Sequence, residues 1–148
     1  MQRSQRLQVV LDLEKRREDA ALTNMQQARN ALQAEEQRLE ELQQYLAEYH
    51  EQMRKGSQGT VHVARLQAMH GFVNQLNDAI GHQRQRVESF QQQFAQARDQ
   101  WRQAWDRREG MARFIEECRR QEQHAADRQE QREIDEAANL RFAHKQRH

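Results

Sequence analysis

The chain has no proline, five glycines, one cysteine and few aromatic residues. Without proline, no ring removes a backbone N–H from a helix. The lone Cys118 cannot form an intramolecular disulfide, which fits a reducing compartment. With 36% hydrophobic and 32% charged residues, the 148-residue chain cannot fill a core of ordinary globular size. Disorder, or long helices joined along a narrow apolar seam, remain as alternatives.

An excess of charge of one sign is also lacking. The chain has 24 Lys and Arg against 23 Asp and Glu, interspersed, for a net charge of +1. This balance gives no electrostatic footprint for nucleic acid, so an RNA-binding coiled coil is disfavoured. No apolar run approaches the ~18 residues of a membrane span, and the first residues lead into no signal-peptide core. We therefore expect a soluble, cytoplasmic protein.

The motifs of common enzyme classes are missing too. The sequence holds no phosphate-binding loop, no GxSxG nucleophile motif, no HExxH zinc motif and no paired cysteines. His144 and His148 have the spacing of a helical metal chelate, but they lie at the terminus without a third ligand. We expect no catalysis, no cofactor, no metal and no small-molecule substrate.

What the sequence does contain is a helical period. Alternating steps of three and four residues from Leu11 to Met53 meet apolar side chains at ten of thirteen positions. A second series from Met69 to Cys118 meets them at thirteen of fifteen. The polar exceptions are Glu14, Glu18, Glu35, Gln83 and Arg108. Each series is a coiled-coil seam, so the predicted fold is all-α, with two helices that pack against each other.

The stretch KGSQGT, residues 55–60, separates the two seams. Gly56 and Gly59 disfavour helix, Ser57 supports a turn, and Thr60 can cap the following helix. We interpret the stretch as the tip of an antiparallel hairpin that forms a single domain. The predicted elements are a helix over about 4–55, the tip at 56–61, a second helix over about 62–140 and a frayed tail at 141–148.

The register follows from matching the two seams head to tail. Pairs whose residue numbers sum to 122 place Ala21 opposite Trp101 and the seam charges Glu14 and Arg108 opposite each other. A shift of one heptad, to a sum of 115, would place Glu14 on Trp101 and is less favourable. With the first register, residues 119–148 project past the N-terminus, so the second helix is the longer one.

Apolar residues also lie beside the seam near the tip. Tyr45, Phe72 and Ala79 occupy flanking positions that the seam does not need, which indicates either a partner surface or flank packing. Gly71 and Gly81 each cost about 1 kcal/mol in a helix interior. The simplest explanation for them is the close approach of another backbone.

The chain resembles the FliJ family of the bacterial flagellar type III export apparatus over nearly its whole length. The resemblance rests on four stretches and on the spacing of aromatic residues about the tip. The stretches are QAEEQ at 33–37, LQQYLAEY at 42–49, RLQAMHGFVNQLNDAIGHQR at 65–84 and QREIDEAANLR at 131–141.

The resemblance implies a non-enzymatic hairpin similar to the central stalk of rotary ATPases. Its implied partners are the hexameric export ATPase FliI, whose ring form it favours, the export-gate protein FlhA, and export chaperones. The implied location is the cytoplasm, at the inner face of the membrane below the flagellum. The implied gate-binding residues are Leu42, Tyr45, Tyr49, Phe72, Leu76, Ala79 and Gln83. By the stalk analogy, the ATPase-binding residues are Leu7, Leu11, Arg17, Ile115, Arg119 and Ile134.

Two alternatives remain open at this point. The chain could be the equivalent stalk of a virulence-type secretion system, which shares the hairpin form and size. It could also be a structural rod that self-associates in parallel, with KGSQGT as a mere break. A monomeric hairpin is the preferred interpretation.

Overall fold

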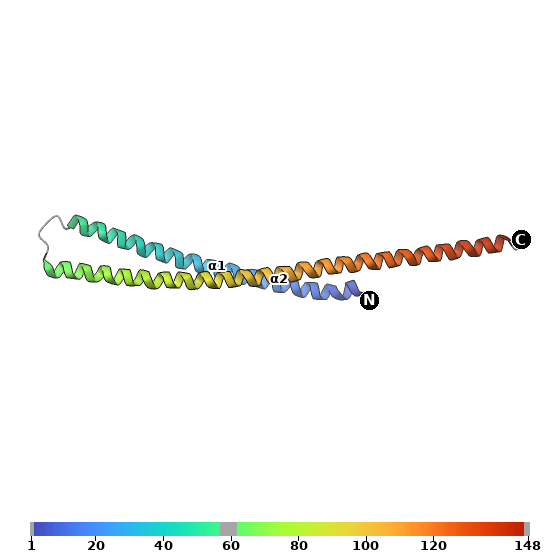
Figure 1. The fold of residues 1–148 in the computed structure, drawn as a ribbon, viewed down its shortest axis with the longest axis horizontal. Coiled ribbons are helices and arrows are strands. Elements are labelled where there is room, and N and C mark those ends of the chain that lie inside the picture. Colours follow the sequence, from blue (N-terminus) through green and yellow to red (C-terminus); the bar gives the residue numbers. More distant parts are fainter. Residues whose placement is uncertain (1, 57–61, 147–148) are drawn as a thin grey trace. The chain divides into compact units, whose positions relative to one another are not determined.

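The structure is a computed structural model that describes residues 2–56 and 62–146. It contains two helices, α1 (Arg3–Gly56, 54 residues) and α2 (Val63–Gln146, 84 residues), and the described residues include no strand (Figure 1). The predicted all-α helical hairpin with a longer second helix is thereby confirmed.

The helix ends follow from local chemistry. Arg54 and Lys55 lie in the last turn of α1, where cations complement the negative end of the helix dipole. Gly56 is still helical, whereas most of the predicted tip, residues 57–61, lies outside the described residues. The second helix is helical as far as Gln146, so residues 141–146 are helix where the sequence analysis expects a frayed tail.

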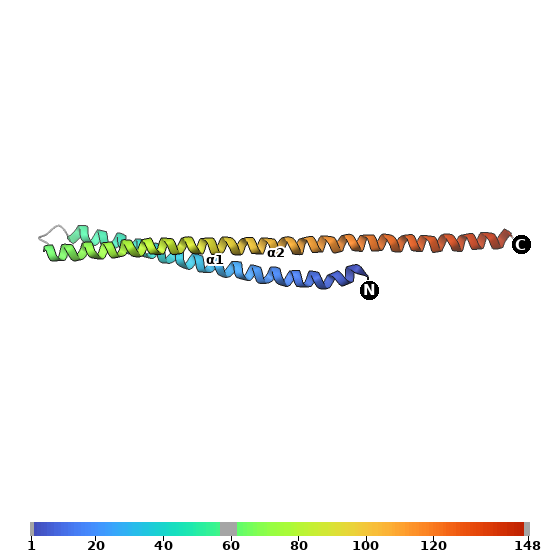
Figure 2. The same ribbon diagram turned by 60° about the horizontal axis from the view of Figure 1, so that its bottom comes forward.

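Both helices contribute to each of two compact units. The terminal unit comprises Met1–Asp19 and Gln103–His148, and the central unit comprises Ala20–Arg102. Within the central unit, the two helices run antiparallel and lie side by side in both views (Figures 1 and 2). None of the helices, over the residues that the structure describes, has a stretch long and apolar enough to cross a bilayer.

The core of each unit is the predicted seam. The buried apolar residues of the central unit are Leu76, Ile80, Val87 and Ala97, and those of the terminal unit are Leu11, Ala104, Ile115 and Cys118. Ile115 is the most buried of them, at 2% exposed. Every one of these positions belongs to the two series read from the sequence. Cys118 is therefore a packing residue in the seam.

Contacts between the helices define the register. The contacting residues have numbers that sum to between 117 and 121 in the central unit and to 126 or 127 in the terminal unit, so the predicted 122 lies between the two ranges. The pairs are Tyr45–Phe72, Tyr49–Phe72, Glu35–Gln83, Glu35–Arg86, Glu18–Arg108, Gln8–Arg119 and Ser4–Glu122. In the terminal unit, a sum of 115 would separate Glu18 from Arg108 by more than three helical turns, so the contacts favour the first register.

One predicted pair is wrong. Arg108 does not contact Glu14 but forms ion pairs with Glu18 and with Glu109, and Glu14 instead lies 3.1 Å from Arg17 on its own helix. The Arg108 side chain is long enough for its guanidinium to reach Glu18, one helical turn along α1 from Glu14. An antiparallel register therefore fixes which layers meet, but it does not fix which charges pair.

Candidate partner-binding surfaces

The residues implied for gate binding lie together in the central unit, where they form what we call the aromatic patch. Tyr45 is 50% exposed, and Leu42, Tyr49, Phe72 and Ala79 are partly exposed. Leu76 and Gln83, the other two, are buried between the helices. Five of the seven residues are therefore accessible to a partner in this conformation.

Phe72 of α2 packs against both tyrosines of α1. Its ring centroid lies 4.7 Å from that of Tyr49, with the planes tilted by 60°, and 6.0 Å from that of Tyr45, with the planes at 83°. Such tilted and edge-to-face pairs are favourable geometries for aromatic rings. The sequence left open whether these residues form a partner surface or pack beside the seam. The structure fits both, because the rings join the two helices while Tyr45 keeps half of its surface exposed.

Gln83 is engaged inside the hairpin. Its Nε2 donates hydrogen bonds to the main-chain oxygen of Glu35, at 2.9 Å, and to Oε2 of the same residue, at 2.6 Å. The guanidinium of Arg86 donates to Oε2 as well, with Nε at 3.1 Å. Hydrogen bonds from Arg86 and then from Gln83 hold the pKa of Glu35 below its usual value. This polar layer interrupts the apolar seam, and the sequence analysis noted both seam residues as exceptions without foreseeing their contact.

The sequence predicts that another backbone approaches Gly71 and Gly81, and that backbone does not come from the described residues of this chain. A Cβ added at Gly71 or Gly81 would meet no other atom within 4 Å. No backbone among the described residues approaches either glycine, so the chain's own packing does not require them. Both glycines are exposed.

The residues implied for ATPase binding belong to the terminal unit and divide by exposure. Leu11 and Ile115 are buried in the seam, and Leu7 is partly buried. The exposed members are Arg17, Arg119 and Ile134. The Nη2 of Arg119 donates to Oε1 of Gln8 on α1, at 3.3 Å, so this arginine also joins the helices.

A second exposed apolar surface in the terminal unit was missed by the sequence analysis. Val9, Val10 and Leu13 of α1 are 72%, 37% and 45% exposed and line a shallow hollow of about 340 Å³. Three apolar residues within five positions, beside the seam residue Leu11 but not on the seam, were the available signal. Phe114 of α2 is also exposed, and the guanidinium of Arg3 lies 5.1 Å from its ring centroid.

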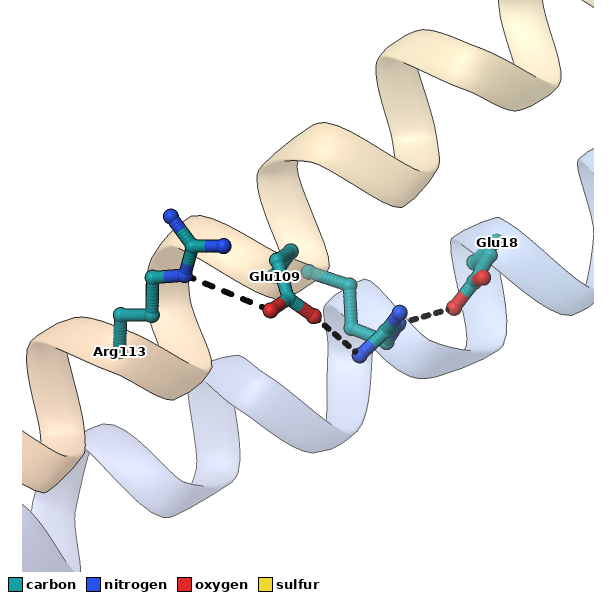
Figure 3. A network of polar contacts seen from close by, with 4 residues as sticks. Glu18, Glu109 and Arg113 are labelled. Carbon is teal, nitrogen blue, oxygen red and sulfur yellow. Dashed lines mark hydrogen bonds and ion pairs between the residues drawn. The ribbon is translucent and has the colours of Figure 1, made fainter.

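Charged groups hold the terminal unit together at its seam. The guanidinium of Arg108 on α2 contacts Glu18 on α1 and also Glu109, whose other oxygen lies 3.4 Å from Nε of Arg113 (Figure 3). Half-buried ion pairs that share partners in this way fix helix orientation more than they add net stability.

The N-terminus of α1 is capped by a residue of α2. The first turn of α1 has no acidic residue of its own. The Ser4 backbone N–H donates to one carboxylate oxygen of Glu122 at 3.0 Å, and the Ser4 hydroxyl donates to the other at 2.6 Å. These bonds, that of the hydroxyl foremost, lower the pKa of Glu122. A carboxylate at this position also complements the positive end of the helix dipole.

Beyond Glu122, α2 continues as a helix whose residues 123–146 are all exposed; we call this the C-terminal segment. Its largest apolar side chains, Ile134, Leu140 and Phe142, are 54%, 72% and 63% exposed. Nowhere in residues 2–56 and 62–146 do three or more His, Cys, Asp or Glu side chains gather as a metal site would require.

Comparison with known proteins points to one family of the flagellar export system. The model of the family described as flagellar FliJ protein matches residues 2–147. No curated protein and no solved structure matches the chain.

Proposed function

The chain belongs to the flagellar FliJ family and is a component of the flagellar protein export apparatus, and we propose that it acts there as a non-enzymatic stalk for the export ATPase. In this proposal the terminal unit binds the hexameric ATPase FliI and favours its ring form. The aromatic patch binds the export-gate protein FlhA, and export chaperones are further partners. The protein works in the cytoplasm, held at the membrane through these partners.

One observation carries the stalk assignment. Residues 123–146 form a helix of which every residue is exposed, although it includes Ile134, Leu140 and Phe142. Large apolar side chains left in water favour a partner that covers them. A helical rod inside a six-fold ring makes different contacts with each subunit, and it can therefore bias the nucleotide states of the subunits.

The internal pairing of the seam supports a monomer. A parallel rod of two chains would need the same apolar side chains that this chain already buries between α1 and α2. The exposed surfaces remain available for other partners. The seam paired within one chain therefore favours an export hairpin over a structural dimer.

ATP hydrolysis by FliI, measured against FliI concentration with and without the chain, tests the stalk assignment. We expect half-maximal activity at a lower FliI concentration when the chain is present, because the chain promotes ring assembly. Ile134→Asp should remove this shift, whereas His124→Asp, also at an exposed position of the C-terminal segment, should keep it. An unchanged concentration dependence with folded wild-type chain would refute the assignment.

Gate binding has its own test. Tyr45→Ala removes a half-exposed ring and should weaken binding to the cytoplasmic part of FlhA by about tenfold, while changing stability little. Trp105→Ala, which also removes a partly exposed aromatic ring but in the terminal unit, is the matched control. Equal effects of the two variants on FlhA binding would argue against the aromatic patch.

A further inference from the structure

A hollow in the central unit lies between the last turns of α1 and the first turns of α2. Its volume is about 490 Å³, within the range of pockets that accept ligand groups. Its apolar lining comes from Tyr49 and Met53 on one helix and from Leu66 and Met69 on the other. Leu66 remains 44% exposed. Methionine side chains are flexible and polarisable, so such a lining adapts to an incoming side chain.

The same region has an unusual charge. Residues 52–77 contain no Asp or Glu, although the chain has 23 acidic residues, and this is its longest stretch without one. The stretch carries Arg54, Lys55 and Arg65, a local charge of +3 in a chain whose net charge is +1. Arg54 and Arg65 also line the hollow. The nearest acid in the sequence, Glu51, contacts Arg54 and Lys55 rather than Arg65.

From the shape and charge of this hollow, we infer that it binds the apolar face of an acidic amphipathic α-helix supplied by a partner protein. A hollow between two helices accepts side chains that recur every three to four residues on a third helix. Acidic residues flanking those anchors would face Arg65, whose charge Glu51 does not offset, which gives charge complementarity. A lipid surface could meet the basic side chains, but it offers no side chains spaced to fill a hollow between two helices.

The inference does not depend on the stalk assignment, because it rests on the hollow and its charge alone. The hollow shares Tyr49 with the aromatic patch, so one partner can cover both. Neither Leu66 nor Arg65 belongs to the residues proposed for gate or ATPase binding. Variants at these two positions therefore test the hollow by itself.

The five methionines provide the measurement. We would label the methionine methyl groups of the full chain with ¹³C and add a synthetic helical peptide of about 18 residues, with Leu at every third or fourth position, one Glu beside each Leu and Ala elsewhere. Met53 and Met69 line the hollow and should shift, whereas the seam residues Met25 and Met111 should not. A matched peptide with Lys in place of every Glu should bind at least about tenfold more weakly.

Three variants sharpen the test, each first shown by circular dichroism to be helical. Leu66→Ala should weaken binding of the Glu peptide about tenfold, because it removes an anchor of the hollow. Arg65→Glu should weaken the Glu peptide and strengthen the Lys peptide. Arg102→Glu, which changes the net charge equally at an exposed position far along α2, should do neither.

The inference is overturned by any of four results. Equal affinity for the Glu and Lys peptides would show that charge does not select the partner. Absence of any shift would show that the hollow accepts no helix. Shifts of Met53 and Met69 with phosphatidylglycerol vesicles but not with peptide would assign the surface to a membrane. Shifts that depend on protein concentration alone would assign it to a second copy of the chain.

Discussion

The second helix has two parts that differ in burial although both are rich in Gln, Arg, Glu and Ala. Residues 63–122 bury a stripe from Leu76 to Cys118, whereas residues 123–146 are all exposed. The second part still contains Ile134, Leu140 and Phe142, but their spacing does not continue the seam. The comparison teaches that burial depends on whether α1 lies opposite: Ser4, near the start of α1, contacts Glu122, so no described residue of α1 lies opposite residues 123–146.

The exposed part must be stabilised locally. Three glutamines in it donate to acids four residues on: Gln123 to Asp127 at 3.0 Å, Gln129 to Glu133 at 3.4 Å, and Gln131 to Asp135 at 3.1 Å. Such pairs add a few tenths of a kcal/mol each to a helix. The buried part gains its stability from packing instead, so substitutions should affect the two parts very differently.

The largest expected difference is between two isoleucines. Ile115→Ala should destabilise the hairpin by about 3 kcal/mol, because the side chain is 2% exposed and its loss leaves a cavity. Ile134→Ala, at 54% exposed, should cost no more than about 0.5 kcal/mol. Urea unfolding followed by circular dichroism measures both. Equal losses would mean that the C-terminal segment packs against something in the free protein.

Two substitutions of Trp101 test how packing stabilises the buried part of α2. The residue is half-buried, and its buried indole Nε1 has no acceptor among the residues that the structure describes. Trp101→Ala should cost about 2–3 kcal/mol, since much apolar contact is lost. Trp101→Phe should be close to neutral, because it keeps most of that contact and removes the unsatisfied donor. If the Phe variant unfolded as easily as the Ala variant, the indole N–H would have to be bonded in solution.

Replacing glycines by alanine should change the stability by less than the substitutions at Ile115 and Trp101, and it should raise the stability. Because Gly71 and Gly81 are helical and face open space, each Gly→Ala change should stabilise the free chain by about 0.5–1 kcal/mol. Gly110→Ala, in the terminal unit and equally open, is the matched control for stability. If a partner backbone approaches the central unit, the first two variants should also weaken FlhA binding, and the control should not. Destabilisation by any of the three would contradict the open surroundings.

Much of this fold could be predicted from the sequence, because a two-helix seam is a one-dimensional pattern. Leu76, Ile80 and Ile115 are buried where steps of three and four place them. The pairing of Arg108 with Glu18 could not be predicted, since a long side chain chooses among layers only about a helical turn apart. For the same reason, the hydrogen bonds from Gln83 to Glu35 could not be predicted. These choices depend on side-chain reach in three dimensions, which spacing along the chain does not encode.

The candidate surfaces were likewise predictable from the sequence only in part. Spacing predicts that Tyr45 and Tyr49, four residues apart, share a face of α1, and the antiparallel register places Phe72 of α2 beside them. It also placed Leu76 and Gln83 in the seam, where both are buried. It could not tell that Tyr49, Met53, Leu66 and Met69 line a hollow. A hollow depends on how far two helices separate locally. The partners of these surfaces remain predictions.

The smallest expected effect concerns the cap of α1 and its dependence on pH. Because hydrogen bonds from Ser4 lower the pKa of Glu122 below its usual 4.5, the cap is fully present above pH 4.5. It is lost as the pH falls through the lowered pKa and the carboxylate takes up a proton.

The Ser4 amide signal in a ¹⁵N NMR titration should therefore change below pH 4.5 while the seam stays folded. Glu122→Gln should abolish this titration. Glu117→Gln, which removes a carboxylate that pairs with Arg120 on its own helix, should leave it intact. If Ser4 titrated equally in the Glu122→Gln chain, the cap would have to come from another acid, and α1 would not be tied to α2 at its first turn.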